Sequence, residues 1–153
     1  MDEDTIQTAF APFVAALREG SFAVPAEGWS VELVAAHVSR NNDLISEAAE
    51  RIVAGERPSY DNNAAVDDAE LGSYADAVGS LAGLADAVET SARRLATAWA
   101  ALDEATESYL LPVVIRDSGN VVNDGPTPIR KFIEGNASFH LDMHFGQLKA
   151  LQL

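Results

Sequence analysis

The chain has 153 residues and a strongly acidic balance, with 24 acidic against 10 basic side chains and a formal net charge of −14. A surface of this charge repels phosphate groups, which excludes nucleic acid and anionic membranes as partners. The chain contains no cysteine, so disulfides, thiolate metal ligands, iron–sulfur clusters and a cysteine nucleophile are excluded as well. Any metal must be held by imidazole or carboxylate groups, and any thiol chemistry needs a thiol from outside.

The size of the chain predicts a single domain over residues 1–153. Hydrophobic residues make up 48% of it, which is enough for a core, and the abundance of alanine favours helices. No apolar run approaches the roughly 20 residues of a membrane span. The acidic start, Met1–Asp4, differs from the basic first region of a signal peptide. A cytoplasmic protein is therefore expected.

The first half of the chain shows two stretches with the apolar periodicity of helices. The first predicted helix covers residues 4–18 and ends at Gly20, and Pro12 within it is expected to kink the helix or delay its start. The second predicted helix covers residues 30–54. Ser30 precedes its apolar stripe and is the expected N-cap.

The middle of the chain combines a loop, a long helix and a hairpin. Residues 56–65 are rich in proline, serine, asparagine and aspartate and predict a loop. A third helix is predicted over residues 67–102, weakened in its first half by three glycines. Residues 109–125 then read as two strands, with the turn sequence Asp117-Ser118-Gly119-Asn120 between them.

The last helix is predicted to start near Thr127, with Pro128 at its first helical position, and to continue to the end of the chain. Together these elements predict an all-α fold. It is an up-down four-helix bundle with a small β-hairpin-like insertion before the last helix.

Three histidines are the strongest candidates for chemistry, and they are the only histidines in the chain. His140 and His144 are four residues apart, so both point to one side of the last helix. His37 lies on the apolar stripe of the second helix. Facing helices of a bundle are where metal sites are built, so the three rings predict a site for one divalent ion. Histidines that merely pack in the core are the alternative.

The site that the three histidines predict has open coordination positions, which is the mark of a catalytic metal. Zinc or nickel is the expected ion, and iron also suits imidazole ligands. Three neighbouring amides, one helical turn or less from the histidines, are candidates to orient the rings by hydrogen bonds. They are Asn41, Asn136 and Gln147.

The sequence from His140 to His144 is not that of a zinc protease. Such a motif requires glutamate directly after the first histidine as the general base, and Leu141 stands there. Asp142 lies about 200° around the helix from His140 and points away from the pair.

These residues resemble the signatures of the DinB-like superfamily. Trp29-Ser30 followed by His37-Val38 is similar to its first signature, and His140 and His144 are similar to its second, a His-x-x-x-His on the last helix. The superfamily includes thiol-dependent S-transferases and mycothiol-dependent maleylpyruvate isomerases. The resemblance implies a four-helix bundle in which the three histidines bind a metal.

The chain differs from the isomerases at one of the ligand positions, and this difference indicates to which branch of the superfamily it is more similar. The isomerases carry Glu-x-x-x-His at the last two ligand positions, whereas this chain has histidine at both, His140 and His144. That difference favours the S-transferase-like or general DinB-like branch. The implied activity is a metal-dependent transfer of a small thiol, mycothiol or a similar molecule, to an electrophilic substrate.

Two other functions and an assembly state remain open from the sequence. A metal-dependent hydrolase would activate water instead of a thiol, although no general base stands out beside the histidines. A bundle that binds a metal or ligand without turnover is the third possibility. A homodimer is possible, because bundles often pair through an exposed apolar face.

Overall fold

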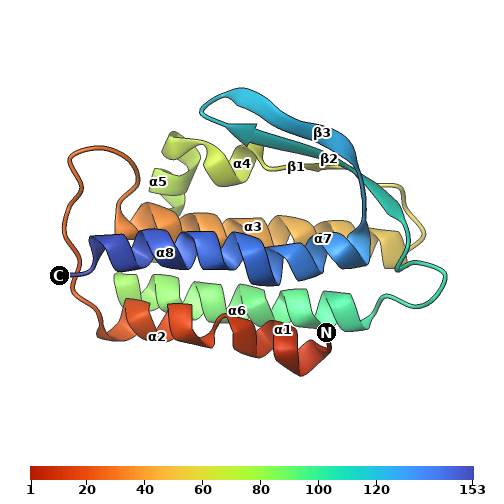
Figure 1. The fold of residues 1–153 in the computed structure, drawn as a ribbon, viewed down its shortest axis with the longest axis horizontal. Helices are drawn as coiled ribbons and strands as arrows, with labels where there is room; N and C mark the ends of the chain where they lie inside the picture. The colour runs from red at the N-terminus through yellow and green to blue at the C-terminus, as the bar shows by residue number, and fades with distance from the viewer.

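The computed structural model describes residues 1–153, and about 63% of them are helical. The long helices form four rods that run side by side (Figure 1). These rods are α1 (Glu3–Ala9) with α2 (Ala11–Glu19), then α3 (Val31–Val53), then α6 (Leu81–Ala100), and finally α7 (Ile129–Gly135), η1 (Asn136–His140) and α8 (Leu141–Leu151) in one continuous run. α6 contacts α1, α2 and α3, and α3 also contacts α8.

The expectation of an all-α four-helix bundle holds only in outline, because a sheet and two shorter helices lie outside the rods. The additional elements are β1 (Tyr60–Asp61), α4 (Asn63–Val66), α5 (Asp68–Val78), β2 (Leu110–Asp117) and β3 (Asn120–Pro128). The strand order is β1-β2-β3, with β1 parallel to β2 and β2 antiparallel to β3. Figure 1 shows these elements gathered on the α3 side of the rods, where α4 and α5 contact α3.

The first rod is interrupted where Pro12 predicts it. α1 ends at Ala9, and Pro12 lies in the first turn of α2, where a missing backbone N–H removes no helical hydrogen bond. The expected kink is therefore a break between two short helices.

The second rod, α3, is regular and central. Ser30 caps it as predicted, its hydroxyl accepting a hydrogen bond from the Leu33 N–H at 3.5 Å. Most of its 23 residues are buried or half-buried, because α4 and α5 cover one side and α6 and α8 the other. Polar side chains in α3 must therefore find partners inside the protein.

The single third helix predicted over residues 67–102 is wrong. α5 ends at Val78, Gly79 adopts a left-handed conformation with φ of 81°, and Ser80 caps α6 by accepting a hydrogen bond from the Gly83 N–H at 3.0 Å. Apolar periodicity continues through this corner, which hides the break from a pattern analysis. The predicted loop over residues 56–65 likewise contains β1 and most of α4.

The hairpin is confirmed and is longer than predicted. Ser118 and Gly119 have φ of 51° and 80°, the geometry of a two-residue turn that matches the twist of paired strands. Because β3 pairs with β2 as far as Pro128, the last helix starts at Ile129 and not near Thr127 as predicted. Thr127 and Pro128 pair in the sheet instead of starting the helix.

The end of the chain is fastened to the connection between α2 and α3. The Ala23 N–H donates to the Leu151 carbonyl and the Leu153 N–H donates to the Ser21 carbonyl, both at 2.8 Å. These bonds hold α8 beside α2 and α3. None of the helices combines the length and the apolar character that crossing a bilayer requires.

Candidate metal centre

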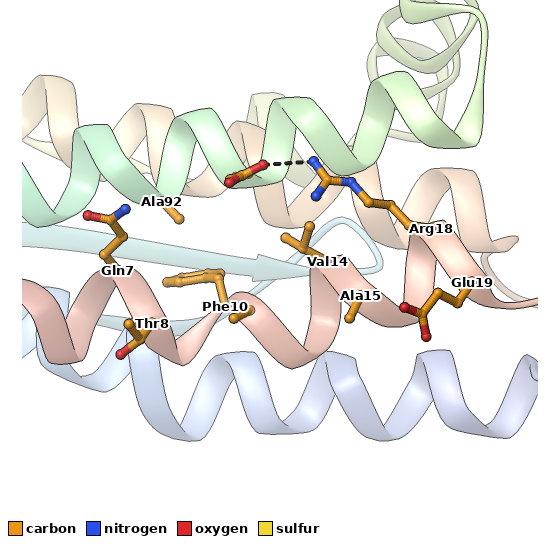
Figure 2. A pocket seen from close by; sticks show the side chains of 10 residues that line it. Gln7, Thr8, Phe10, Val14, Ala15, Arg18, Glu19 and Ala92 are labelled. Atoms are coloured by element: carbon orange, nitrogen blue, oxygen red, sulfur yellow. Dashed lines mark hydrogen bonds and ion pairs between the residues drawn. The ribbon is translucent and has the colours of Figure 1, made fainter.

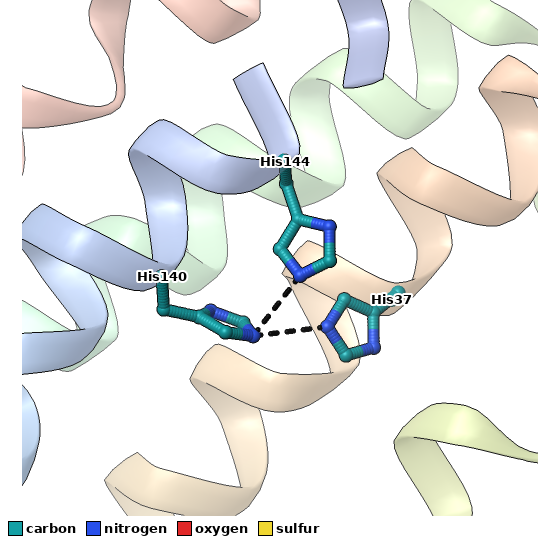
Figure 3. Close-up of side chains that lie close together, drawn as sticks. All are labelled: His37, His140 and His144. Carbon is teal, nitrogen blue, oxygen red and sulfur yellow. Dashed lines mark hydrogen bonds between the residues drawn. The ribbon is translucent and has the colours of Figure 1, made fainter. Parts of the chain in front are cut away.

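The three predicted histidines meet between α3 and the C-terminal helical run. His37 projects from the first third of α3, and His140 and His144 project from η1 and α8 toward it (Figure 3). His37 and His144 are each only 3% exposed, and His140 is half-buried. The site therefore lies inside the protein, with His140 on the side nearest the solvent.

The Nε2 atoms of the three rings face one another. Nε2 of His140 lies 3.2 Å from Nε2 of His37 and 3.0 Å from Nε2 of His144. Two nitrogens that share a tetrahedral zinc at roughly 2.0–2.1 Å lie about 3.3 Å apart. The spacing of the three rings is therefore close to that of ligands around one ion. One ligand atom from each of the three residues lies within 4.8 Å of the other two.

The opposite ring nitrogen is engaged in two of the three histidines. Nδ1 of His37 is 2.5 Å from the backbone carbonyl of Ala65 in α4, and Nδ1 of His144 is 2.8 Å from Oε1 of Gln147. Both oxygens are acceptors, so each Nδ1 carries the proton and each neutral ring keeps a bare lone pair on Nε2. This is the arrangement that orients metal-binding histidines in proteins.

A count of protons shows that the centre fits a cation. His37 and His144 present bare Nε2 lone pairs, and Nε2 of His140 can supply at most one hydrogen to its two neighbours. At least one of the two close nitrogen–nitrogen contacts therefore has no hydrogen of its own between the two atoms, in a buried place. An ion that accepts all three lone pairs would remove this unfavourable contact.

The protonation state of the three rings also suits the binding of a metal ion. Burial and the nearby His144 lower the pKa of His37 to about 4, and burial with both neighbouring histidines lowers the pKa of His140 to about 3. Burial also lowers the pKa of His144, although the hydrogen bond to Gln147 opposes the shift. All three rings are neutral at pH 7, the form that binds metals.

Trp29 forms a wall of the site, whereas in the sequence it stood out only as part of the first family signature. Its indole ring centroid lies 5.0 Å from that of His37 and 6.5 Å from that of His144. The indole N–H donates to the carboxylate of Asp68 at 2.7 Å. Asp68 starts α5, so this bond ties α5 to the wall. No sequence pattern links positions 39 residues apart.

The predicted orienting amides divide into two groups. Gln147 contacts His144, as expected. Asn41 and Asn136 hydrogen-bond to each other, with 2.7 Å between Nδ2 of Asn41 and Oδ1 of Asn136, and neither bonds to a histidine ring. The Ala65 carbonyl takes the position expected for an amide beside His37. A backbone group leaves no mark in the sequence, so this partner was missed.

The last helix contains a wide turn that periodicity does not predict. Residues Asn136–His140 form a π-turn, and the Leu141 N–H donates to the Asn136 carbonyl across five residues. Turns of this kind insert one extra residue into a helix and are frequent at functional sites. His140 is the last residue of the turn.

A separate groove of about 290 Å³ lies between the first rod and α6 and contains none of the histidines. Figure 2 shows Arg18 reaching across it toward α6, where its guanidinium pairs with Asp86 and Glu89, both at 2.7 Å. Because this cation is already neutralised, the groove offers no free positive charge for an anionic ligand.

Comparison with known proteins gives a single family. A search of curated proteins and a search of solved structures return no match. The family model described as the mycothiol maleylpyruvate isomerase N-terminal domain matches residues 4–115. The match includes His37 and Trp29 but ends before His140 and His144, so the branch preference drawn from His140 stays a prediction. The chain belongs to the family of mycothiol maleylpyruvate isomerase N-terminal domains, within the DinB-like superfamily.

Proposed function

We propose that the chain is a divalent-metal-dependent transferase that activates a small thiol, whose sulfur then attacks an electrophile. The observation that carries the proposal is the convergence of three neutral imidazoles whose Nε2 atoms lie 3.0 and 3.2 Å apart, with too few protons to satisfy one another. His37, His140 and His144 would hold the ion, and zinc or nickel suits this ligand set.

The three ligands also suit an ion that activates a thiol. Three protein ligands leave at least one coordination position open, and an ion there lowers the pKa of a thiol that binds it. The buried rings are neutral and no carboxylate belongs to the cluster, so the ligands add no negative charge that would oppose an anionic sulfur. The nucleophile must come from a cosubstrate, because the chain has no cysteine.

The family supports mycothiol as the thiol to test, since the name of the family includes that molecule. In the proposed reaction the thiol S–H bond breaks and the sulfur forms a bond to an electrophilic carbon. The proton is taken up by the leaving group or by an adjacent atom of the acceptor, so the transfer requires no oxidant or reductant. Trp29, beside two of the three rings, would exclude water from the inner side of the site.

Elemental analysis of protein purified without a histidine tag tests the metal. We expect about one divalent ion per chain, and loss of that ion in His140→Ala. Met143→Ala is the matched control, since Met143 lies one residue from a ligand and is 47% exposed. Protein that contains no metal and also binds neither added zinc nor added nickel would contradict the proposal.

Activity assays on the metal-loaded protein then test the reaction. We expect consumption of a model electrophile that depends on both mycothiol and metal, and that is lost in His140→Ala. Hydrolysis of esters or amides without any thiol would instead indicate a metal-dependent hydrolase. Metal binding without turnover of either kind would indicate a binding protein.

A further inference from the structure

A chain of buried polar side chains runs beside the histidine cluster, one helical turn away from it. Its five members come from four elements, and each is at most 5% exposed. They are Tyr60 of β1, Asn41 and Asn42 of α3, Asn136 of η1 and Ser91 of α6. Side chains of this kind cost free energy to bury unless they are hydrogen-bonded, so their arrangement requires an explanation.

The hydrogen bonds along this chain run in one direction. The Tyr60 hydroxyl donates to Oδ1 of Asn41, and Nδ2 of Asn41 donates to Oδ1 of Asn136 at 2.7 Å. Nδ2 of Asn136 donates to Oδ1 of Asn42 at 2.8 Å, and Nδ2 of Asn42 donates to the Ser91 hydroxyl at 3.3 Å. The hydroxyl of Ser91 completes the chain by donating to the Val88 carbonyl at 3.0 Å.

Asn136 is the link between the two helices that carry the histidines. Its side-chain oxygen and nitrogen are both engaged, one by Asn41 and the other by Asn42, so the amide is clamped between consecutive residues of α3. Asn41 is four residues after His37, and Asn136 is four residues before His140. The clamp therefore lies about one turn from the ligands on both helices.

The clamp is also where the π-turn begins. Of the five residues in that turn, only Asn136 and Ala137 are buried, while Ser138 is exposed and Phe139 is 79% exposed. Burial of a large apolar side chain therefore does not hold the wide turn in place. Apart from the contact of His140 with His37, the two hydrogen bonds of Asn136 are the side-chain hydrogen bonds that tie the turn to another helix. His140, at the other end of the turn, has no hydrogen bond at Nδ1 to fix its ring.

We propose that Asn136, clamped between Asn41 and Asn42, is a positioning residue that fixes the π-turn and thereby sets His140 against His37 and His144. This inference rests on the proposed metal site. It assigns to the polar chain the task that the Ala65 carbonyl performs for His37 and Gln147 performs for His144. His140 is held through its backbone, by the turn that ends with it.

The test compares cobalt(II) binding to wild type and to Asn136→Ala, followed by the visible absorption bands of the bound ion. We expect wild type to bind cobalt, and Asn136→Ala to bind it about 10–100-fold more weakly with altered band positions and intensities. The reason is that the His140 ring is no longer held in position against His37 and His144. The melting temperature of each metal-free protein is measured in parallel.

Ile52→Ala is the matched control for loss of stability. Ile52 is a core residue of α3 that lies ~15 Å along the helix from Asn42, so its substitution should lower the melting temperature and leave the cobalt affinity and spectrum unchanged. If Asn136→Ala does not fold, Asn42→Ala replaces it, since it removes one of the two clamping bonds and should shift the spectrum in the same direction.

The outcomes separate the two proposals. Wild-type affinity and spectrum in a folded Asn136→Ala or Asn42→Ala variant would overturn the positioning role and leave the metal site intact. A variant that binds weakly only in proportion to a stability loss shared by Ile52→Ala would overturn it too. Wild type that binds no cobalt would overturn the proposed function, and the positioning role with it.

Discussion

The two helical segments that carry the histidines differ in how they hold their ligands. α3 is an unbroken helix of 23 residues, and a backbone carbonyl, that of Ala65, fixes the ring of His37. The C-terminal run changes from α-helix to π-turn and back within 23 residues, and it holds its histidines through the side chains of Gln147 and Asn136. In the regular helix, packing and a backbone group are enough to hold the ligand in place. In the irregular segment, additional side chains are needed to hold the ligands.

The largest expected effect tests whether the two segments contribute equally. His37→Ala and His140→Ala should each weaken zinc binding by more than about 100-fold, since removing a ligand costs more than removing the group that orients it. Isothermal titration of the two variants beside Met143→Ala measures this. A variant that keeps wild-type affinity would show that its segment does not belong to the site.

Acid should destabilise the metal-free protein through the same rings. The pKa of His37 is about 4 and that of His140 about 3, below the value of about 6.5 for an exposed histidine. Between pH 6.5 and 4 the unfolded chain therefore binds protons that the folded chain does not. The free energy of unfolding should fall as the pH falls, by about 1.4 kcal/mol per pH unit for each such histidine.

Urea unfolding at pH 7, 6 and 5 measures that slope. Carboxylates also contribute at the acidic end, so the informative quantity is the difference between wild type and His140→Gln. We expect a shallower slope in the variant. Equal slopes would mean that His140 is protonated as easily in the folded chain as in the unfolded one.

A smaller effect is expected from the side chain that orients His144. Gln147→Ala removes the acceptor from Nδ1 and should weaken zinc binding by about 10–100-fold. Gln147→Glu keeps an acceptor oxygen at the same place and should retain most of the affinity. An unchanged affinity in Gln147→Ala would show that the C-terminal segment needs no orienting group there.

The smallest effect concerns the other irregular stretch, between α5 and α6. Gly79→Ala should destabilise the protein by about 1 kcal/mol, since φ of 81° is unfavourable for a residue with a side chain. Gly72→Ala, inside α5 with open space around it, should stabilise by up to about 1 kcal/mol. Thermal unfolding measures both, and opposite signs are the expected result.

Regular elements could be predicted from the sequence because their causes are local. Ser30 as a cap and the turn at Ser118 and Gly119 follow from neighbouring residues. The break at Gly79 and the π-turn at Asn136 do not, because apolar spacing continues through both. The parallel pairing of Tyr60 with Val113 joins distant segments and has no local cause.

The candidate site shows the same division. The helical stripes place His37, His140 and His144 on inward faces, and that much follows from spacing. Which group orients each ring depends on what the fold places beside it. The Ala65 carbonyl reaches His37 because β1 and α4 fold back over α3, and Asn136 reaches Asn41 and Asn42 because two helices meet at that level. Both partners became visible only in three dimensions.

The contact between His37 and His140 joins positions 103 residues apart in the chain. Contacts that close so long a loop are made slowly, after the local helices, because the entropy of the loop must be lost first. We therefore expect the histidine cluster to be among the last parts of the protein to assemble. An ion bound there would stabilise the finished fold without assisting the early steps, so it would act mainly by slowing unfolding. The same three rings that serve chemistry would then set how long each molecule stays folded.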